Sequence, residues 1–161
     1  MSSRATRSII VVEDSNEDFE ILQFACKSAS FELNLVRCEN GEEAVDCLNG
    51  RGKYSGHFLP PALVLLDLNL PLMSGKEVLR YIKTSDRLKT LPVVVFSSSP
   101  NPKDIAECYR IGASSYIVKP LGLVQMRALI ESLTRYWLEL VELTPEVERY
   151  EDNSETTVDR R

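Results

Sequence analysis

The sequence predicts an α/β protein in which five parallel strands form one doubly wound sheet. Short apolar, β-branched runs alternate with segments of helical periodicity, which is the pattern of strand-helix-strand units. The run 63–66 is apolar throughout, as expected for a strand buried on both faces of a parallel sheet. Right-handed crossovers then bring the carboxyl ends of the strands to one edge, where ligands bind in this class of fold.

The expected elements follow one another in a regular order. Strands are expected over 8–12, 33–38, 63–66, 93–96 and 115–118, and the alternation within 33–38 indicates a strand nearer the sheet edge. Helices are expected to begin at Ser15 or Asn16, after Asn40, beyond Gly75 and at Asn101-Pro102, with Gly112 closing the fourth. The last helix is expected from Leu123 to about Leu143, before Thr144-Pro145, and the Gly- and Pro-rich run 50–61 is expected to be a surface loop.

Length and composition bound the organisation of the chain. The 161 residues suffice for one domain, expected over 8–143, with an arm over 1–7 before it and a mobile acidic tail over 144–161 after it. The net charge of -5 argues against a general nucleic-acid binder. No apolar stretch reaches the roughly 20 residues of a membrane span, and no apolar signal region precedes the first strand, so a cytoplasmic location is expected.

The four cysteines and the single histidine offer little to catalysis or metal binding. The cysteines have no C-x-x-C spacing and lie within apolar patterns, so we expect reduced thiols in or near the core. They are Cys26, Cys38, Cys47 and Cys108. His57 is expected in a loop, and a single histidine does not favour a zinc site or histidine-based catalysis.

Polar side chains follow four of the five expected strands. They are Glu13 and Asp14 after the first strand, Asp67 after the third, Ser97 after the fourth and Lys119 after the fifth. Three carboxylates in one partly desolvated pocket need a cation to stay ionised, and Mg²⁺ prefers such oxygen ligands. Asp67 could attack a phosphoryl group in line, while the cation and Lys119 neutralise the phosphoryl oxygens and Ser97 donates a hydrogen bond to one of them.

With these residues the chain resembles the receiver domain of two-component response regulators over approximately residues 8–135. The matching residues are Glu13-Asp14, Asp67 with Pro71 and Gly75 beyond it, Ser97 and Lys119-Pro120. Asp67 and Ser97 lie 30 positions apart, and Ser97 and Lys119 lie 22 apart, close to the family's usual spacing. The resemblance implies a flavodoxin-like fold with strand order 2-1-3-4-5, and a signalling domain rather than an enzyme.

The resemblance also implies roles for individual residues. Asp67 is expected to accept phosphate from the phosphohistidine of a sensor kinase, and Lys119 is expected to pair with the phosphoryl group. Glu13, Asp14 and Asp67 are expected to bind Mg²⁺, and the backbone carbonyl of Asn69 is expected to complete the metal site.

Ser97 and Tyr116 look like the family's switch pair. On phosphorylation the Ser97 hydroxyl would move toward the phosphoryl oxygens, and the Tyr116 ring would turn inward. An ordinary aromatic side chain on a half-buried strand is an equally good interpretation of Tyr116. The resemblance further implies a cis peptide bond between Lys119 and Pro120.

Two features, the long loop before the third strand and the extended last helix, point to a particular group within the family. The segment between Cys47 and Leu63 is longer than usual, and the extended last helix carries Tyr136 and Trp137. Both features are similar to those of the small stand-alone response regulators that partner cyanobacterial phytochrome histidine kinases. Trp137 would serve core packing, a dimer face or both. We expect a homodimer built from the fourth helix, the fifth strand and the last helix, with residues from Tyr136 onward.

Three alternatives use the same residues differently. A haloacid-dehalogenase-type phosphatase would also use Asp67 as nucleophile, but it needs an acid two positions later, where Asn69 stands. A flavodoxin-like cofactor carrier would have to bind phosphate on the acidic loop 13–18, which repels phosphate without a metal. A degenerate scaffold without phosphorylation would not need every one of the matching groups.

Overall fold

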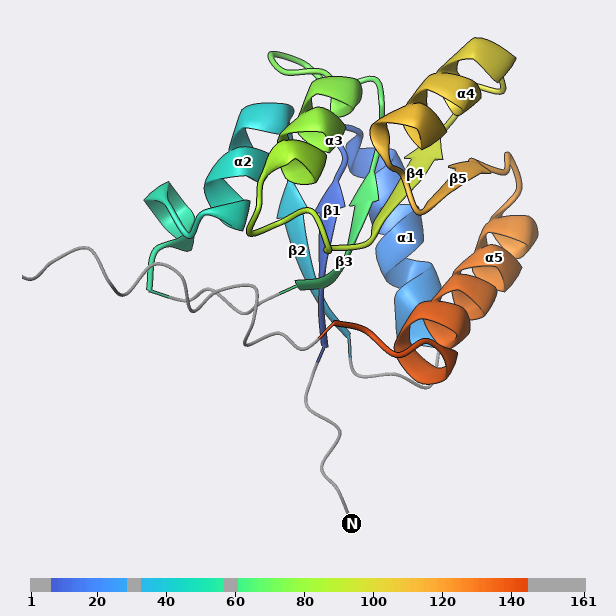
Figure 1. Ribbon diagram of the computed structural model, residues 1–161. Helices are drawn as coiled ribbons and strands as arrows, with labels where there is room; N and C mark the ends of the chain where they lie inside the picture. Colours follow the sequence, from blue (N-terminus) through green and yellow to red (C-terminus); the bar gives the residue numbers. More distant parts are fainter. Residues whose placement is uncertain (1–6, 29–32, 57–60, 145–161) are drawn as a thin grey trace, which may run out of the picture.

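The computed structural model describes residues 7–28, 33–56 and 61–144, with a sheet of five parallel strands at its centre (Figure 1). The strands lie in the order β2-β1-β3-β4-β5, which confirms the predicted fold class and strand order. Their bounds are Arg7–Val12 (β1), Leu33–Cys38 (β2), Pro61–Leu66 (β3), Val93–Ser97 (β4) and Ser115–Val118 (β5). β3 is buried at every position, as its unbroken apolar run predicts for a central strand.

Helices cover both faces of the sheet. They are α1 (Asn16–Ser28), α2 (Gly41–Leu48), the short 3-10 helix η1 (Gly52–Tyr54), α3 (Gly75–Thr84), α4 (Pro102–Ile111) and α5 (Leu123–Arg135). α2, α3 and α4 pack on one face, and α1 and α5 pack on the other (Figure 1). In the described part of the chain, no helix is long and apolar enough to cross a membrane.

Two apolar clusters hold these layers together. Leu66 belongs to the cluster beneath α2, α3 and α4, whereas its neighbour Leu65 belongs to the cluster beneath α1 and α5. Successive residues of β3 thus alternate between the two clusters, because strand side chains point to opposite faces of a sheet. The four predicted core thiols, Cys26, Cys38, Cys47 and Cys108, are all free and buried, which confirms their interpretation as small core residues.

Cap residues start α2 and α4 where the sequence predicts, and α3 begins at Gly75, within the segment predicted to be a turn. The Asn40 side chain accepts a hydrogen bond from an amide in the first turn of α2, and Ser74 forms a reciprocal capping box with Glu77 before α3. Asn101 caps α4 in the same way, and Gly112 ends it with φ of 125°, in the region that favours glycine. These caps fix the helix positions around the sheet.

The last helix ends earlier than predicted. It is α-helical only to Arg135, and a π-helical turn, η2 (Tyr136–Leu140), ends it before the expected end at Leu143. Trp137 in this turn packs against the core beneath α1 and α5, and Val141 already has extended backbone. The helix therefore ends in a wider turn three residues before the predicted end, and apolar periodicity alone does not reveal such a turn.

The predicted loop over 50–61 is partly structured. Residues 52–54 form η1, where the Tyr54 hydroxyl donates a hydrogen bond to the carbonyl of Arg37 at 3.2 Å. β3 begins at Pro61, which the sequence pattern predicts to be the last residue of the loop. His57, residues 1–6 of the expected arm and residues 145–161 of the expected tail lie outside the described residues.

Ion pairs between α3 and α4 predict a dependence of stability on pH. The Lys76 ammonium lies 2.8 Å from Asp104 and 2.6 Å from Glu107, and its hydrogen bonds hold the pKa of both carboxyls below their usual range. A carboxyl with a lowered pKa in the folded state stabilises the fold above its unfolded pKa, near about 4, and loses that contribution as the pH falls through its folded pKa.

We therefore expect Lys76→Met to lower the free energy of unfolding at neutral pH, and the deficit to shrink as the pH falls below about 4. Urea unfolding of the parent and the variant across this range measures the deficit. Lys103→Met, at an exposed lysine of α4, is the control for loss of a positive charge. A deficit that stays constant down to acid pH would contradict the assignment.

Candidate functional site

The predicted polar residues converge at the carboxyl edge of the sheet. Backbone hydrogen bonds continue the strand ladders beyond their ends and so place the side chains. The amide of Asp67 donates to the carbonyl of Val12 at 3.0 Å. The amide of Lys119 donates to the carbonyl of Ser97 at 2.9 Å, and the amide of Glu13 donates to the last carbonyl of β2 at 3.0 Å. The ends of β1, β3, β4 and β5 therefore share one pocket, as the sequence predicts.

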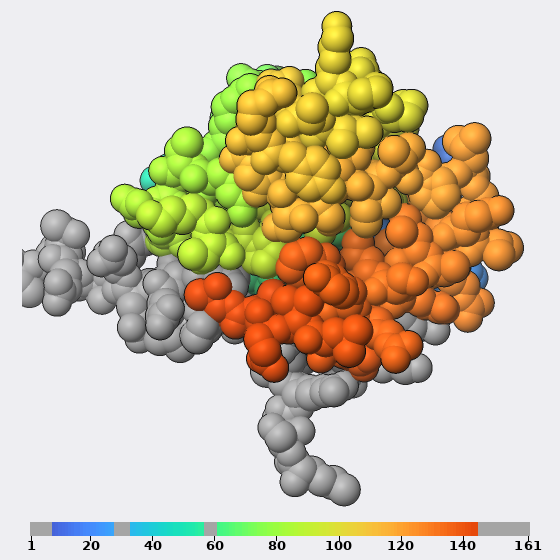
Figure 2. All heavy atoms as spheres, turned by 45° about the vertical axis from the view of Figure 1, so that its right-hand side comes forward, coloured from blue at the N-terminus to red at the C-terminus, as the bar shows by residue number. Residues whose placement is uncertain are grey.

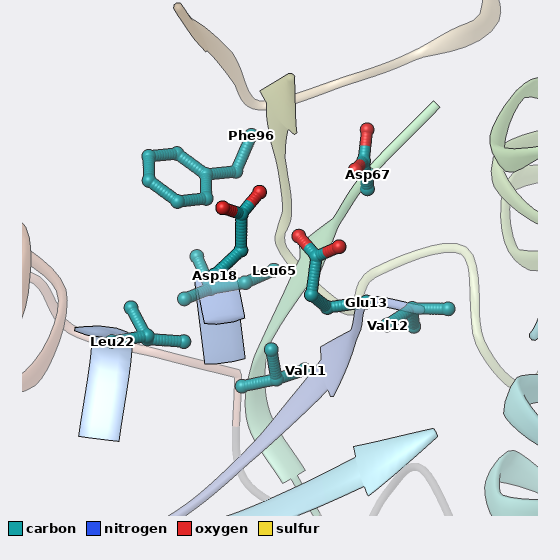
Figure 3. Close-up of a pocket in the computed structure, with 8 residues that line it drawn as sticks. All are labelled: Val11, Val12, Glu13, Asp18, Leu22, Leu65, Asp67 and Phe96. Carbon is teal, nitrogen blue, oxygen red and sulfur yellow. The ribbon is translucent and has the colours of Figure 1, made fainter. Parts of the chain in front are cut away.

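The Lys119 ammonium lies at the centre of this pocket. Its Nζ donates to Oε2 of Glu13 at 2.5 Å, to Oδ2 of Asp67 at 2.9 Å and to Oδ2 of Asp18 at 2.7 Å. Only 8 % of the lysine side chain is exposed. Figure 3 shows the carboxylate of Glu13 between those of Asp18 and Asp67, with Asp18 beside the ring of Phe96. The predicted pair of Asp67 and Lys119 is thus in direct contact.

Asp18 is a member of the pocket that sequence reasoning missed. It belongs to the acidic run 13–18, for which the sequence predicts a strand end followed by a helix start. The signal that could have found it is its place in the first turn of α1, directly after the acidic pair. A side chain there can reach the sheet edge, but one helical turn offers several directions, and only the structure shows that Asp18 faces Lys119.

For both Glu13 and Lys119, burial shifts the pKa in one direction and hydrogen bonds between charged groups shift it in the other. Burial raises the pKa of Glu13 above its usual value, although its hydrogen bonds from Lys119 and from the Ser15 amide oppose the shift. Burial alone would lower the pKa of Lys119, but the hydrogen bonds to Asp18, Glu13 and Asp67 outweigh it and raise that pKa above its usual value. The lysine is therefore a permanent cation that balances part of the carboxylate charge.

Three carboxylates of the pocket fit a divalent metal ion. Ligand oxygens of Glu13, Asp14 and Asp67 all lie within 4.8 Å of one another, and Glu13 and Asp67 are buried whereas Asp14 is exposed. Hard cations such as Mg²⁺ bind carboxylate oxygens and keep several waters, so an exposed ligand beside two buried ones suits them. The Asn69 amide donates to Oδ1 of Asp67 at 3.2 Å, which places the Asn69 backbone beside this cluster.

Arg37 holds the acidic loop after β1 and was also missed. Its guanidinium donates to the carbonyls of Glu13 and Asp14 at 3.1 Å each, and to the Asn16 side chain at 2.8 Å. Its Cζ lies 4.8 Å from the centroid of the Phe19 ring. Arg37 pairs with Val11 of β1 across the sheet. The register of the two strands places Arg37 beside the acidic loop, and a single sequence does not reveal that register.

The side chains of Ser97 and Tyr116 both form hydrogen bonds with the backbone of Ser99. Ser97 is fully buried, and its hydroxyl oxygen accepts a hydrogen bond from the Ser99 amide at 3.2 Å. The Tyr116 hydroxyl donates to the Ser99 carbonyl at 2.8 Å, and the half-buried ring packs against the core beneath α2, α3 and α4. The predicted switch residues are thus joined by one residue of the loop after β4, which the sequence interpretation assigned to a turn.

The prediction of a cis peptide bond before Pro120 is wrong. All peptide bonds in the described part of the chain are trans, including the one between Lys119 and Pro120. The trans form is the more stable form of an X-Pro bond by about 0.5–1 kcal/mol, and the Lys119 side chain reaches the pocket with it.

Tyr136 and Trp137 differ in exposure. Their rings meet edge to face with centroids 5.3 Å apart. Trp137 packs against the core, which agrees with the core-packing interpretation of this residue. Tyr136 is 53 % exposed and Leu140 is 65 % exposed, so η2 presents an apolar surface on its outer side.

The fold and the pocket together define a phosphoacceptor domain of the two-component type, and comparison with known proteins agrees. The response regulator receiver domain family matches residues 9–131, and the chain belongs to this family. It is 34% identical to the response regulator Rcp1 of Synechocystis sp. over 141 residues, which cover 88% of this chain and 95% of Rcp1.

Two solved structures are similar in fold and in sequence. The phosphorylated cyanobacterial phytochrome response regulator RcpA has a TM-score of 0.82 and 35% identity, covering 88% of this chain and 100% of that chain. The Mn²⁺-bound form of Rcp1 has a TM-score of 0.80 and 34% identity, covering 86% of this chain and 99% of that chain. The predicted similarity to cyanobacterial phytochrome response regulators is thereby confirmed.

The phosphatase alternative finds no support. The family that matches the chain is the response regulator receiver domain, which is a signalling family, and the relative Rcp1 is a response regulator. The position two residues after Asp67 is Asn69, whose backbone amide donates to the Asp67 carboxylate and whose side chain has no acidic proton for a leaving group.

Proposed function

We propose that Asp67 receives a phosphoryl group from the phosphohistidine of a sensor histidine kinase, and that this modification changes the protein contacts of the chain. The observation that carries the proposal is the Lys119 ammonium, which binds Asp67 and Glu13 at once, beside the carboxylate of Asp14. A carboxylate nucleophile with a fixed cation in contact is the arrangement that phosphoryl transfer to a carboxylate needs.

The side chains of Asp67, Lys119 and Ser97 would carry out the phosphoryl transfer. An oxygen of Asp67 forms a bond to phosphorus while the bond between phosphorus and the kinase imidazole breaks, and the imidazole nitrogen keeps the electron pair. Lys119 then pairs with an equatorial oxygen of the phosphoryl group, and the buried Ser97 hydroxyl donates a hydrogen bond to another. No general base is needed because a carboxylate is itself the nucleophile.

Glu13, Asp14 and Asp67 would hold the divalent metal, with the Asn69 backbone carbonyl as a further ligand. Bound there, Mg²⁺ supplies positive charge to the phosphoryl oxygens. The clustering of the three carboxylates supports this assignment, and so does the similarity to a Mn²⁺-bound relative. Arg37 contributes by holding the backbone of the two consecutive acidic residues in place.

The response would pass through the loop after β4. When the Ser97 hydroxyl turns toward the phosphoryl group, it gives up the hydrogen bond from the Ser99 amide. Ser99 also holds the Tyr116 hydroxyl, so its movement would release the ring. A population shift between two packings of the face formed by β4, α4 and β5 would result.

The choice of phosphate donor rests on the similarity to known response regulators. The resemblance to RcpA and Rcp1 favours a phytochrome histidine kinase as the phosphate donor, with slow self-phosphorylation and dephosphorylation as the chain's own chemistry. The cytoplasmic location and the lack of direct nucleic-acid binding stay predictions from composition. Phosphotransfer from a cyanobacterial phytochrome kinase, compared with transfer from an unrelated histidine kinase, tests the choice of donor.

Incubation with acetyl phosphate and Mg²⁺ tests the phosphoacceptor function. We expect the intact mass of the parent to increase by one phosphate group, and we expect no increase when EDTA removes the metal. A parent that stays unmodified at saturating acetyl phosphate and Mg²⁺ would refute the proposal, and rapid turnover of small phosphate esters would favour an enzyme instead.

Homodimer formation through α4, β5 and α5 is proposed on the exposed apolar residues of this region. Figure 2 shows α4, β5, α5 and η2 side by side on one face. Val118, Tyr136 and Leu140 are exposed there, and together they offer apolar area that association would bury.

We expect sedimentation velocity to show a dimer of the parent at micromolar concentration and a monomer of Leu140→Glu. Leu72→Glu, which changes an exposed leucine of the loop between β3 and α3, is the matched control and should remain dimeric. If the parent is a monomer both with and without phosphate on it, the dimer proposal is wrong.

A further inference from the structure

Asp18 contacts Lys119 from a different element than the other two carboxylates. It lies in the first turn of α1, and its Oδ2 is 2.7 Å from the lysine Nζ. Its carboxylate is not part of the group formed by Glu13, Asp14 and Asp67, whose oxygens lie within 4.8 Å of one another. The lysine therefore joins the candidate metal ligands to a carboxylate beside them.

The three contacts of Lys119 use all the hydrogens of its ammonium group, because a lysine has three donors and no acceptor. Two of its acceptors, Glu13 and Asp67, are also candidate ligands of the metal. A divalent cation entering the cluster competes with the ammonium for those oxygens and repels it. Asp18 is the partner that the lysine can keep.

We propose that Asp18 is a positioning residue that holds the Lys119 ammonium beside the pocket when metal and phosphate enter. With this anchor the lysine gives up Glu13 and Asp67 without leaving the site, and its freed donors face the phosphoryl oxygens. The inference rests on the proposed phosphoacceptor function of Asp67 and concerns how its lysine is held.

The surroundings of Asp18 support this role. Asp18 and Phe96 line the same small cavity, where Leu22 and Leu65 form an apolar wall (Figure 3). The lysine Nζ lies 5.7 Å from the centroid of the Phe96 ring. The Asp18 side chain is 39 % exposed, whereas that of Asp67 is 8 % exposed, so Asp18 remains partly hydrated beside the buried ligand oxygens.

A simpler role for Asp18 is the stabilisation of α1. An acidic residue in the first turn of a helix interacts favourably with the helix dipole, and Glu17 occupies the same turn. Glu17 is exposed, and the three donors of Lys119 are all taken by other residues. Glu17→Gln therefore removes the same charge from the same helical turn without touching the lysine, and serves as the matched control for Asp18→Asn.

The test measures the dissociation constant of Mn²⁺, from the free metal seen by electron paramagnetic resonance, in a double-mutant cycle. We expect Asp18→Asn to weaken Mn²⁺ binding about three- to five-fold, because the unanchored ammonium stays on the ligand oxygens. Glu17→Gln should change binding less. In the Lys119→Gln background, Asp18→Asn should have no more effect than Glu17→Gln. Thermal unfolding confirms that each variant is folded.

The cycle separates this inference from the proposed function. An Asp18→Asn effect equal to that of Glu17→Gln, or one that persists undiminished without Lys119, would overturn the positioning role even if the parent takes up phosphate. A parent that binds Mn²⁺ and shows the coupling, but gains no mass from acetyl phosphate, would instead overturn the phosphoacceptor function, and with it the role of Asp18 in presenting the lysine to phosphate.

Discussion

Asp67→Asn will gain no phosphate from acetyl phosphate under conditions in which the parent gains one. The amide has no anionic oxygen to attack phosphorus, and no other carboxylate of the pocket stands in its place. Asp67 is buried and its Oδ2 already contacts the lysine. Asp14 is exposed, and Asp18 contacts the lysine from α1 with a side chain that is 39 % exposed. Intact mass after incubation measures the difference.

The same substitution should leave the fold intact, so that loss of phosphorylation cannot be attributed to unfolding. Asparagine has nearly the shape of aspartate, and its removal of one charge relieves repulsion from Glu13. We expect the free energy of unfolding to change by no more than about 1 kcal/mol. Asp46→Asn, at an exposed position of α2, is the control and should be phosphorylated like the parent. Phosphate uptake by folded Asp67→Asn would contradict the assignment of the nucleophile.

Gly75→Ala will destabilise the protein strongly and disturb the site at the same time. A Cβ at this position would overlap the carbonyl oxygen of Asp67 and would lie 2.7 Å from Cα of Leu68. Both are backbone atoms of the segment that carries the nucleophile, so no side-chain rotation can relieve the overlap. The Gly75 amide also donates to the Leu68 carbonyl at 3.1 Å, which ties the start of α3 to this segment.

We expect this variant to lose about 3 kcal/mol of unfolding free energy, measured by urea denaturation, and to take up phosphate more slowly than the parent. Gly52→Ala is the control, because Gly52 has φ of 58° and nothing within 4 Å of the added methyl group. Its cost should be only about 1 kcal/mol, from the left-handed backbone alone. Equal stability of the two variants would show that close contact behind Asp67 is not what makes this glycine necessary.

The sequence was sufficient to predict the order of the strands and the polar residues that follow them. Apolar runs identified β3 and β4, and parallel topology then placed Asp67, Ser97 and Lys119 at one edge of the sheet. In the structure the Lys119 ammonium contacts Asp67, and the Lys119 amide donates to the Ser97 carbonyl. This reasoning works because the carboxyl ends of parallel strands share one edge, whatever the details of packing.

The partners of those residues could not be predicted in the same way. Asp18 and Arg37 reach the pocket from a helix and from a neighbouring strand, so their contacts depend on helix rotation and strand register. Ser99 joins the switch pair through its backbone, which carries no sequence signal. The apolar periodicity identified Trp137 as a residue that packs, but it does not reveal the π-helical turn that contains this residue.

Identifying the phosphorylated residue is the most direct test of the proposed phosphoacceptor function. Borohydride reduction of the phosphorylated parent converts an aspartyl phosphate into homoserine, and peptide mass spectrometry then identifies the modified position. We predict homoserine at position 67, in a reaction that requires Mg²⁺. Modification at Asp14, at Asp18 or outside the pocket, with position 67 still aspartate, would contradict the account.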